Sequence, residues 1–277
     1  MFNSFFFSDI LLWVYLAAAC CYIFYMALKK EGVGHLAFAL TIIGWLVNTA
    51  TLIVRTIETG RAPYANLYET MILLSWLVVM GYIAIELKYS HKLRIVGASI
   101  VTLAFLAMGA AAMLPYRYQA IEPLIPALQS NWLILQVITT FVGYAGFAIA
   151  FGIGILYLLK ERAEQRGKPS FFDRFPSSEL LDDLNYKFIA IGFPFVTLGI
   201  ILGAIWANYA WGGYWSWDPK ETWSLIVWFI YAGYFHGRLV RGWRGRKTAY
   251  FSIIGFLAVI FLYWGVSFIL PGLHAYA

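Results

Sequence analysis

The residues best suited to binding chemistry lie in one aromatic stretch, residues 211–223, between two long apolar runs. Four tryptophans, one tyrosine, two glycines and an Asp-Pro pair occur in this stretch. Large rings on a short, stiff segment form a flat, wide surface, which suits a ligand that is itself flat, large and partly apolar. The residues of this candidate binding surface are Trp211, Gly212, Gly213, Tyr214, Trp215, Trp217, Asp218 and Trp223.

Two of the 4 histidines are candidates for ligating a metal. His236 lies deep in a long apolar run, where an ionisable side chain indicates a functional site. The alternative is that His236 reaches the inner membrane interface beside Arg238. His274 follows a Pro-Gly turn, and the alternative there is a histidine in a disordered tail. Because neutral imidazole is an axial ligand of haem iron, a planar ring with a central metal would use both the aromatic rings and the histidines.

The composition indicates which elements must position these residues. The chain is 62% hydrophobic and 12% charged, whereas about a quarter of the residues in a soluble domain are charged. A bilayer core needs about 20 apolar residues per helix. We therefore predict an all-α, polytopic membrane protein with a single membrane domain, residues 1–277, and about eight transmembrane helices. The predicted spans are residues 9–28, 35–54, 67–87, 94–114, 132–159, 188–207, 222–240 and 249–270.

The distribution of Lys and Arg residues predicts the orientation, because basic loops stay on the cytoplasmic side. With both termini outside, only Arg55, Arg61, Arg117 and Lys220 of the 20 basic residues lie on the outer side. Residues 206–223 are then an external loop. Residues 160–187 form a cytoplasmic loop, either a solvated connector or a docking site for a partner. This topology and anionic lipid account for the net charge of +6, so no nucleic-acid partner is needed.

Several other polar or reactive residues have competing interpretations. Glu69 begins the third predicted span, where a carboxylate either favours the helix dipole or has a functional role. Cys20 and Cys21 are adjacent on one helix, so we interpret them as small apolar residues in preference to a redox pair. Asp218 either orients the aromatic stretch, pairing with Lys220, or caps the following helix.

The segment Trp-Ser-Trp-Asp-Pro-Lys-Glu-Thr-Trp, residues 215–223, resembles the tryptophan-rich WWD signature of haem-handling proteins in the form found in the CcsA (ResC) family. Residues 66–69 (Asn-Leu-Tyr-Glu), 235–238 (Phe-His-Gly-Arg) and 272–274 (Gly-Leu-His) resemble CcsA at similar spacings. The resemblance covers the chain, including the eight expected helices with the signature on the outer side.

This resemblance implies that haem b enters from the cytoplasmic side, is held by a membrane histidine and passes to an outer site beneath the WWD surface. There its vinyl groups are joined to an apocytochrome c with a Cys-x-x-Cys-His motif. His236 resembles the membrane histidine, with the opposite ligand supplied by the partner CcsB (ResB). His274 resembles the second of two outer axial histidines.

Gln136 departs from the family pattern, since the family has its first outer histidine at the start of the fifth helix. An amide is a poor axial ligand, so the outer haem here would be five-coordinate, would bind water, or would take a ligand from a partner.

The sequence thus predicts a haem-delivery subunit of a system II cytochrome c synthase (haem lyase), in a bacterial cytoplasmic or thylakoid membrane with the WWD loop on the periplasmic or lumenal side. The alternative is a haem exporter or haem-binding paralogue without ligase activity. A b-type electron-transfer subunit is disfavoured, because it needs facing histidine pairs and only His236 is embedded. No catalytic residue is predicted.

Overall fold

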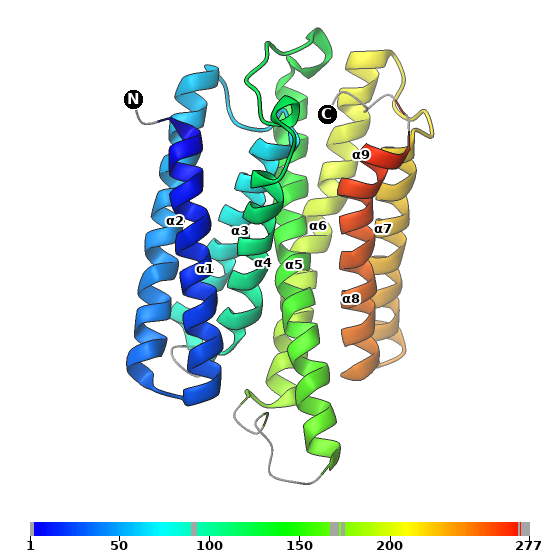
Figure 1. Ribbon diagram of the computed structural model, residues 1–277. Coiled ribbons are helices and arrows are strands. Elements are labelled where there is room, and N and C mark those ends of the chain that lie inside the picture. The colour runs from blue at the N-terminus through cyan, green and yellow to red at the C-terminus, as the bar shows by residue number, and fades with distance from the viewer. Residues whose placement is uncertain (1–2, 90–92, 167–171, 173–174, 271, 273–277) are drawn as a thin grey trace.

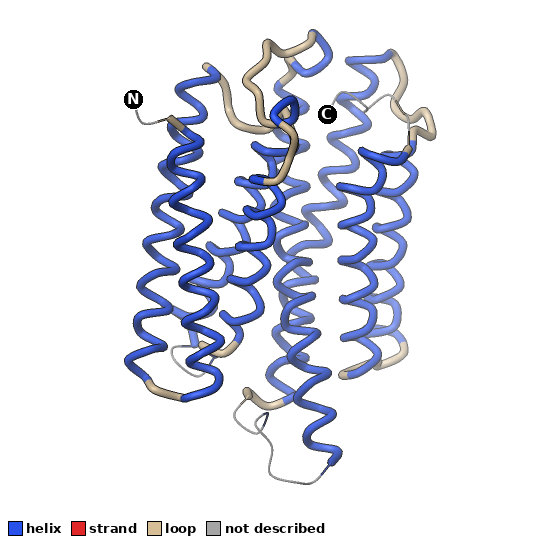
Figure 2. Tube along the Cα trace, viewed as in Figure 1, coloured by secondary structure: helices blue, strands red, loops and turns tan. Residues whose placement is uncertain are grey.

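The protein is a bundle of long helices, as the computed structural model shows for residues 3–89, 93–166, 172, 175–270 and 272 (Figure 1). Figure 2 shows helices joined by short loops, and no strand occurs among the described residues. The all-α prediction is therefore confirmed. The main helices are α1 (Ser4–Leu28), α2 (Glu31–Thr59), α3 (Leu67–Tyr89), α4 (Val96–Ala112), α5 (Asn131–Arg166), α6 (Ser178–Trp211), α7 (Pro219–Phe235), α8 (Arg246–Ile260) and α9 (Val266–Ile269).

Shorter helical turns extend these elements. One π turn, His236–Val240, continues α7, and another, Phe261–Gly265, joins α8 to α9. Two 3-10 turns, Tyr116–Tyr118 and Pro126–Leu128, lie between α4 and α5.

Within the predicted loop, residues 160–187, α5 runs on to Arg166 and α6 begins at Ser178. Ser177 starts α6 by accepting a hydrogen bond from the N–H of Leu180, as an N-cap residue does. Both ends of the predicted loop are therefore helical.

Six of the helices in the described part of the chain are long and apolar enough to cross a membrane: α1, α2, α3, α5, α6 and the continuous run Arg246–Ile269. The protein is therefore an integral membrane protein. Helices α4 and α7 have 17 residues each, fewer than the roughly 20 that a span needs. They occupy the other two predicted positions, and the total of eight spans stays a prediction.

The loops divide between two ends of the bundle (Figure 1). The start of α1, the α2–α3, α4–α5 and α6–α7 connections, and α9 lie at the upper end of the view. The α1–α2, α3–α4 and α7–α8 connections lie at the lower end. This up-and-down path agrees with the predicted order of the spans. The side of the membrane that each end faces stays a prediction.

Helices α5 and α6 pack unusually closely, because glycines remove side chains from their interface. A Cβ atom at Gly143 would lie 2.8 Å from the carbonyl oxygen of Gly192, and a Cβ at Gly192 would lie 2.8 Å from that of Gly143. Small residues allow helix backbones to approach in this way inside a membrane. Phe147, which also lies against Gly192, stacks on Tyr231 of α7 with ring centroids 3.5 Å apart. Helix α5 is thus central to the bundle.

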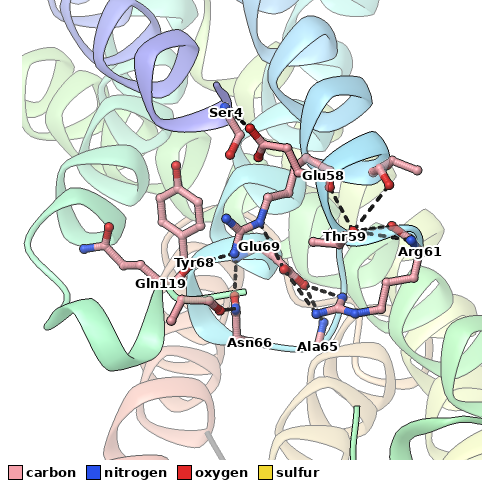
Figure 3. A network of polar contacts seen from close by, with 12 residues as sticks. Ser4, Glu58, Thr59, Arg61, Ala65, Asn66, Tyr68, Glu69 and Gln119 are labelled. Atoms are coloured by element: carbon pink, nitrogen blue, oxygen red, sulfur yellow. Dashed lines mark hydrogen bonds and ion pairs between the residues drawn. The ribbon is translucent and has the colours of Figure 1, made fainter. Parts of the chain in front are cut away.

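A buried charged cluster ties α2 to α3 at the upper end (Figure 3). The fully buried Glu69 carboxylate pairs with Arg55 at 3.1 Å and with Arg61 at 2.8 Å. The Arg55 guanidinium also donates to the carbonyl of Gln119 and lies over the ring of Tyr68. Two of the arginines expected on the outer side are therefore held by one carboxylate.

Asn66 caps the start of α3, because its Oδ1 accepts a hydrogen bond from the N–H of Glu69, and the Glu69 carboxylate in the first turn accepts one from the N–H of Ala65. Glu69 itself serves as the counter-ion described above. Neither Cys20 nor Cys21 is in a disulfide.

We expect Glu69→Gln to lower the free energy of unfolding by about 3 to 5 kcal/mol, because it leaves the buried Arg55 without its charge partner. Glu58→Gln is the matched control, since Glu58 is exposed and accepts one hydrogen bond from the N–H of Ser4. The measurement is the fraction of detergent-purified protein that stays monodisperse after heating. Equal thermal stability of the two variants would contradict a stabilising role for the buried pair.

Candidate functional site

The irregular part of the predicted loop 206–223 is confined to residues 212–218. Helix α6 ends at Trp211 and is capped by Gly212, whose N–H donates to the carbonyl of Asn208 and whose positive φ of 79° turns the chain out of the helix; glycine adopts this conformation without strain. Helix α7 begins with a capping box, in which Asp218 accepts from the N–H of Lys220 and Glu221 accepts from the N–H of Asp218. The cap interpretation of Asp218 is thus confirmed.

The aromatic side chains of the stretch fall into two groups. Trp211 packs on the buried Trp206 with ring centroids 4.7 Å apart, and Trp223 packs on Phe261 at 4.4 Å. Tyr214 and Trp217 are instead 62% and 69% exposed.

The ring centroids of Trp215 and Trp217 are 5.8 Å apart, and the two rings are nearly perpendicular, with an interplanar angle of 87°. The rings therefore present several faces at the upper end of the bundle and not one plane.

A cavity of about 210 Å³ lies beneath this loop, between α5, α6, α7 and the π turn after α8. Three residues of the predicted site line it: Gln136 from α5, and Tyr214 and Trp215 from the loop. Much of the remaining wall is small or polar. That wall includes Thr140, Gly203, Lys220, Glu221, Ser224 and Tyr263.

Among the residues that the structure describes, two polar atoms in the cavity wall are buried without a hydrogen-bond partner, the Oε1 of Gln136 and the Nε1 of Trp215. Gln136 lies against Gly203, where an added Cβ would come within 2.7 Å of the Gln136 Nε2. Because buried polar groups in proteins are nearly always paired, two such atoms around one cavity indicate a place for a ligand or water that supplies the partners.

Lys220 brings positive charge to the cavity. Burial lowers the pKa of its ammonium group, and the nearby Asp218 carboxylate opposes this shift. Lys220 also lies in the first turn of α7, where the helix dipole favours negative charge. Lys220 and Glu221 thus place groups of opposite charge in this part of the wall.

His236 lies far from the cavity, at the opposite end of α7. This helix has 17 residues, so at 1.5 Å per residue the imidazole is about 25 Å from the loop along the axis. The side chain is exposed on the surface of the bundle. Arg238, two residues on, turns inward and pairs with Asp182 at 2.6 Å. His236 therefore faces outward from the bundle while its basic neighbour is held inside.

His274 lies outside the described residues. Gly272, two residues before it in the sequence, is described and lies against the start of α7. A Cβ at Gly272 would come within 3.0 Å of the Pro219 ring and closer still to the Asp218 carboxylate. Gly272 therefore lies directly beside the aromatic loop.

Sequence reasoning missed Glu221 and the α6 side of the cavity. The Asp-x-x-Glu pattern at residues 218–221 is a capping-box signature and could have identified Glu221. The spacing of Gly199, Gly203 and Ala207, all in the cavity wall, places small residues at intervals of four on one face of α6. That pattern could have indicated open space.

Comparison with known proteins connects this arrangement to a family. The Cytochrome C assembly protein family matches residues 64–274. The cytochrome c biogenesis protein CcsA of Guillardia theta is 40% identical over 266 residues, covering 90% of this chain and 87% of that protein. The CcsA protein of Parasynechococcus marenigrum (strain WH8102) is 36% identical over 253 residues and 83% of each chain. The chain therefore belongs to the CcsA family of cytochrome c assembly proteins.

Proposed function

We propose that this protein is the haem-handling and delivery subunit of a system II cytochrome c synthase. Family membership indicates a role in cytochrome c biogenesis, with an apocytochrome c as substrate and a membrane as the setting. In our proposal haem b is the cargo. It arrives from the cytoplasmic side, and the loop of residues 212–218 presents it on the periplasmic or lumenal side to an apocytochrome with a Cys-x-x-Cys-His motif.

The observation that carries this proposal is the cavity beneath the aromatic loop, in whose wall two polar atoms, on Gln136 and Trp215, have no hydrogen-bond partner within the described part of the chain. Its volume of about 210 Å³ is below the roughly 300 to 1,000 Å³ of pockets that enclose a drug-sized ligand. Only one edge of a haem would therefore enter the cavity. The rest of the macrocycle would lie outside it, against the exposed rings of Tyr214 and Trp217.

The two histidines have separate roles in this proposal. His236, exposed on the bundle surface, would ligate haem iron at the membrane site together with a ligand from a CcsB (ResB) partner. His274 would ligate iron at the outer site. The position of Gly272 beside Asp218 and Pro219 supports this assignment, because it brings the chain leading to His274 next to the aromatic loop.

A second candidate function is haem export or haem binding without ligase activity. Gln136 favours this alternative, because an amide in the cavity wall replaces the histidine that the family resemblance leads us to expect. An exporter would use the same loop and His236 but would need no apocytochrome.

Co-expression of this chain with a CcsB protein and an apocytochrome c separates the two functions. We expect a pyridine-haemochrome spectrum of the apocytochrome product to show covalently attached haem, and we expect none when this chain is omitted. Haem bound to the membrane protein with no covalent product would support the exporter. Absence of haem from both proteins would contradict both functions.

We expect His236→Gly to lose haem from the membrane site and to regain part of it when imidazole is added, because free imidazole can replace the missing ligand. Haem content per purified protein is the measurement. His35→Gly is the control, since His35 is also an exposed histidine near the lower end. Equal haem content in both variants would exclude His236 as a ligand.

We expect Gln136→His to shift the absorption spectrum of the outer haem toward a six-coordinate, low-spin form, because imidazole is a far better iron ligand than an amide. Gln129→His, on the exposed outer segment, should leave the spectrum unchanged. An unchanged spectrum for Gln136→His would mean that this position does not face the iron.

A further inference from the structure

Trp217 has an uncommon backbone conformation for a large aromatic residue. Its φ of 59° lies in the left-handed region, which non-glycine residues rarely adopt and which often marks functional sites. Gly212 and Gly213 lie a few residues away in the same loop. The strained position is nevertheless occupied by a tryptophan whose ring is 69% exposed.

The Glu221 carboxylate holds this conformation from both sides. Its Oε2 accepts hydrogen bonds from the N–H of Ser216 at 2.8 Å and from the N–H of Asp218 at 3.1 Å. These amides belong to the residues before and after Trp217, and a left-handed residue between them lets both converge on one anion, as in a backbone nest. The Ser216 hydroxyl donates to the same oxygen at 3.1 Å.

The carbonyl group of Trp217 is held as well, because it accepts a hydrogen bond from the Thr222 hydroxyl at 3.2 Å. The backbone around Trp217 is therefore fastened by two consecutive residues in the first turn of α7. These hydrogen bonds involve backbone atoms and not the Trp217 ring. The plane of this ring stands at 87° to that of Trp215, which lines the cavity.

We propose that Glu221 is a positioning residue for ligand binding. It acts through the main chain of residues 216–218 to keep the Trp217 ring outside the cavity and perpendicular to the Trp215 ring. Its Oε2 is occupied by three donors of the loop, so this oxygen orients the loop and does not receive the ligand. The effect of Glu221 on haem binding rests on the proposed function. The hydrogen bonds by which Glu221 holds the backbone of residues 216–218 do not.

The backbone part is tested by hydrogen exchange on the full chain in detergent, with fragmentation that resolves single amides. We expect Glu221→Ala to speed exchange of the Ser216 and Asp218 amides at least tenfold. Glu221→Gln, which keeps an acceptor oxygen but no charge, should give an intermediate rate. Glu179→Gln is the control, because Glu179 lies in the first turn of α6 and should leave both amides unchanged.

Two further variants separate positioning of Trp217 from ordinary helix capping. Asp218→Ala removes the cap oxygen that binds the Lys220 amide, so it should speed exchange in the first turn of α7 and leave the Ser216 amide protected. Trp217→Gly should slow exchange of the two flanking amides, because glycine adopts a φ near 59° without strain. Unchanged exchange rates of the two flanking amides in Glu221→Ala would overturn the proposal. So would exchange of the Ser216 amide that is as fast in Asp218→Ala as in Glu221→Ala.

The ligand part is tested by adding haem to the same proteins and recording the Soret band. We expect Glu221→Ala to change the band as Trp217→Gly does, and the control Glu179→Gln to leave it near that of the unmodified protein. A band in Glu221→Ala that matches the unmodified protein, while Trp217→Gly differs, would overturn the positioning role. Failure of the unmodified protein to bind haem would instead contradict the proposed function. The hydrogen-exchange result would still decide whether Glu221 holds the backbone around Trp217.

Discussion

The contact between α5 and α6 is the constraint on which the rest of the site depends. Gly143 and Gly192 let the two backbones touch at mid-bundle, which fixes the distance between the helices at the upper end. There, α6 continues with small residues while α5 presents Gln136 and Thr140, so the space between the helices is only partly filled. The α6–α7 loop closes this space from above. A cavity thus follows from a tight contact below it and small side chains beside it.

Much of this architecture could be predicted because it depends on local composition. Long apolar runs indicated the positions of the helices, and the Asp-Pro pair offered capping chemistry for the start of α7 as one of two interpretations. The distance of His236 from the start of α7 was likewise readable by counting residues. Such features need only the period of a helix and the preferences of single residues at its ends.

The remaining features depend on which helices become neighbours, and one sequence does not state this. The direction of His236, outward from the bundle, is set by the packing of Tyr234 and Arg238 against α6. The different surroundings of Trp211 and Trp223, each packed on another ring, depend on α6 and on the turn after α8. The left-handed backbone of Trp217 depends on a carboxylate four residues later. Aromatic content alone predicted a surface but not the directions of its rings.

The shared counter-ion at Glu69 also bears on how the chain enters a membrane. In the orientation that we propose, α2 and α3 insert as a hairpin whose tip carries Arg55 and Arg61 to the side opposite the basic loops, a transfer that positive charge opposes. Glu69 lies in the same hairpin and pairs with both arginines. The hairpin can therefore cross with part of its charge already compensated, without waiting for a later helix to supply an anion.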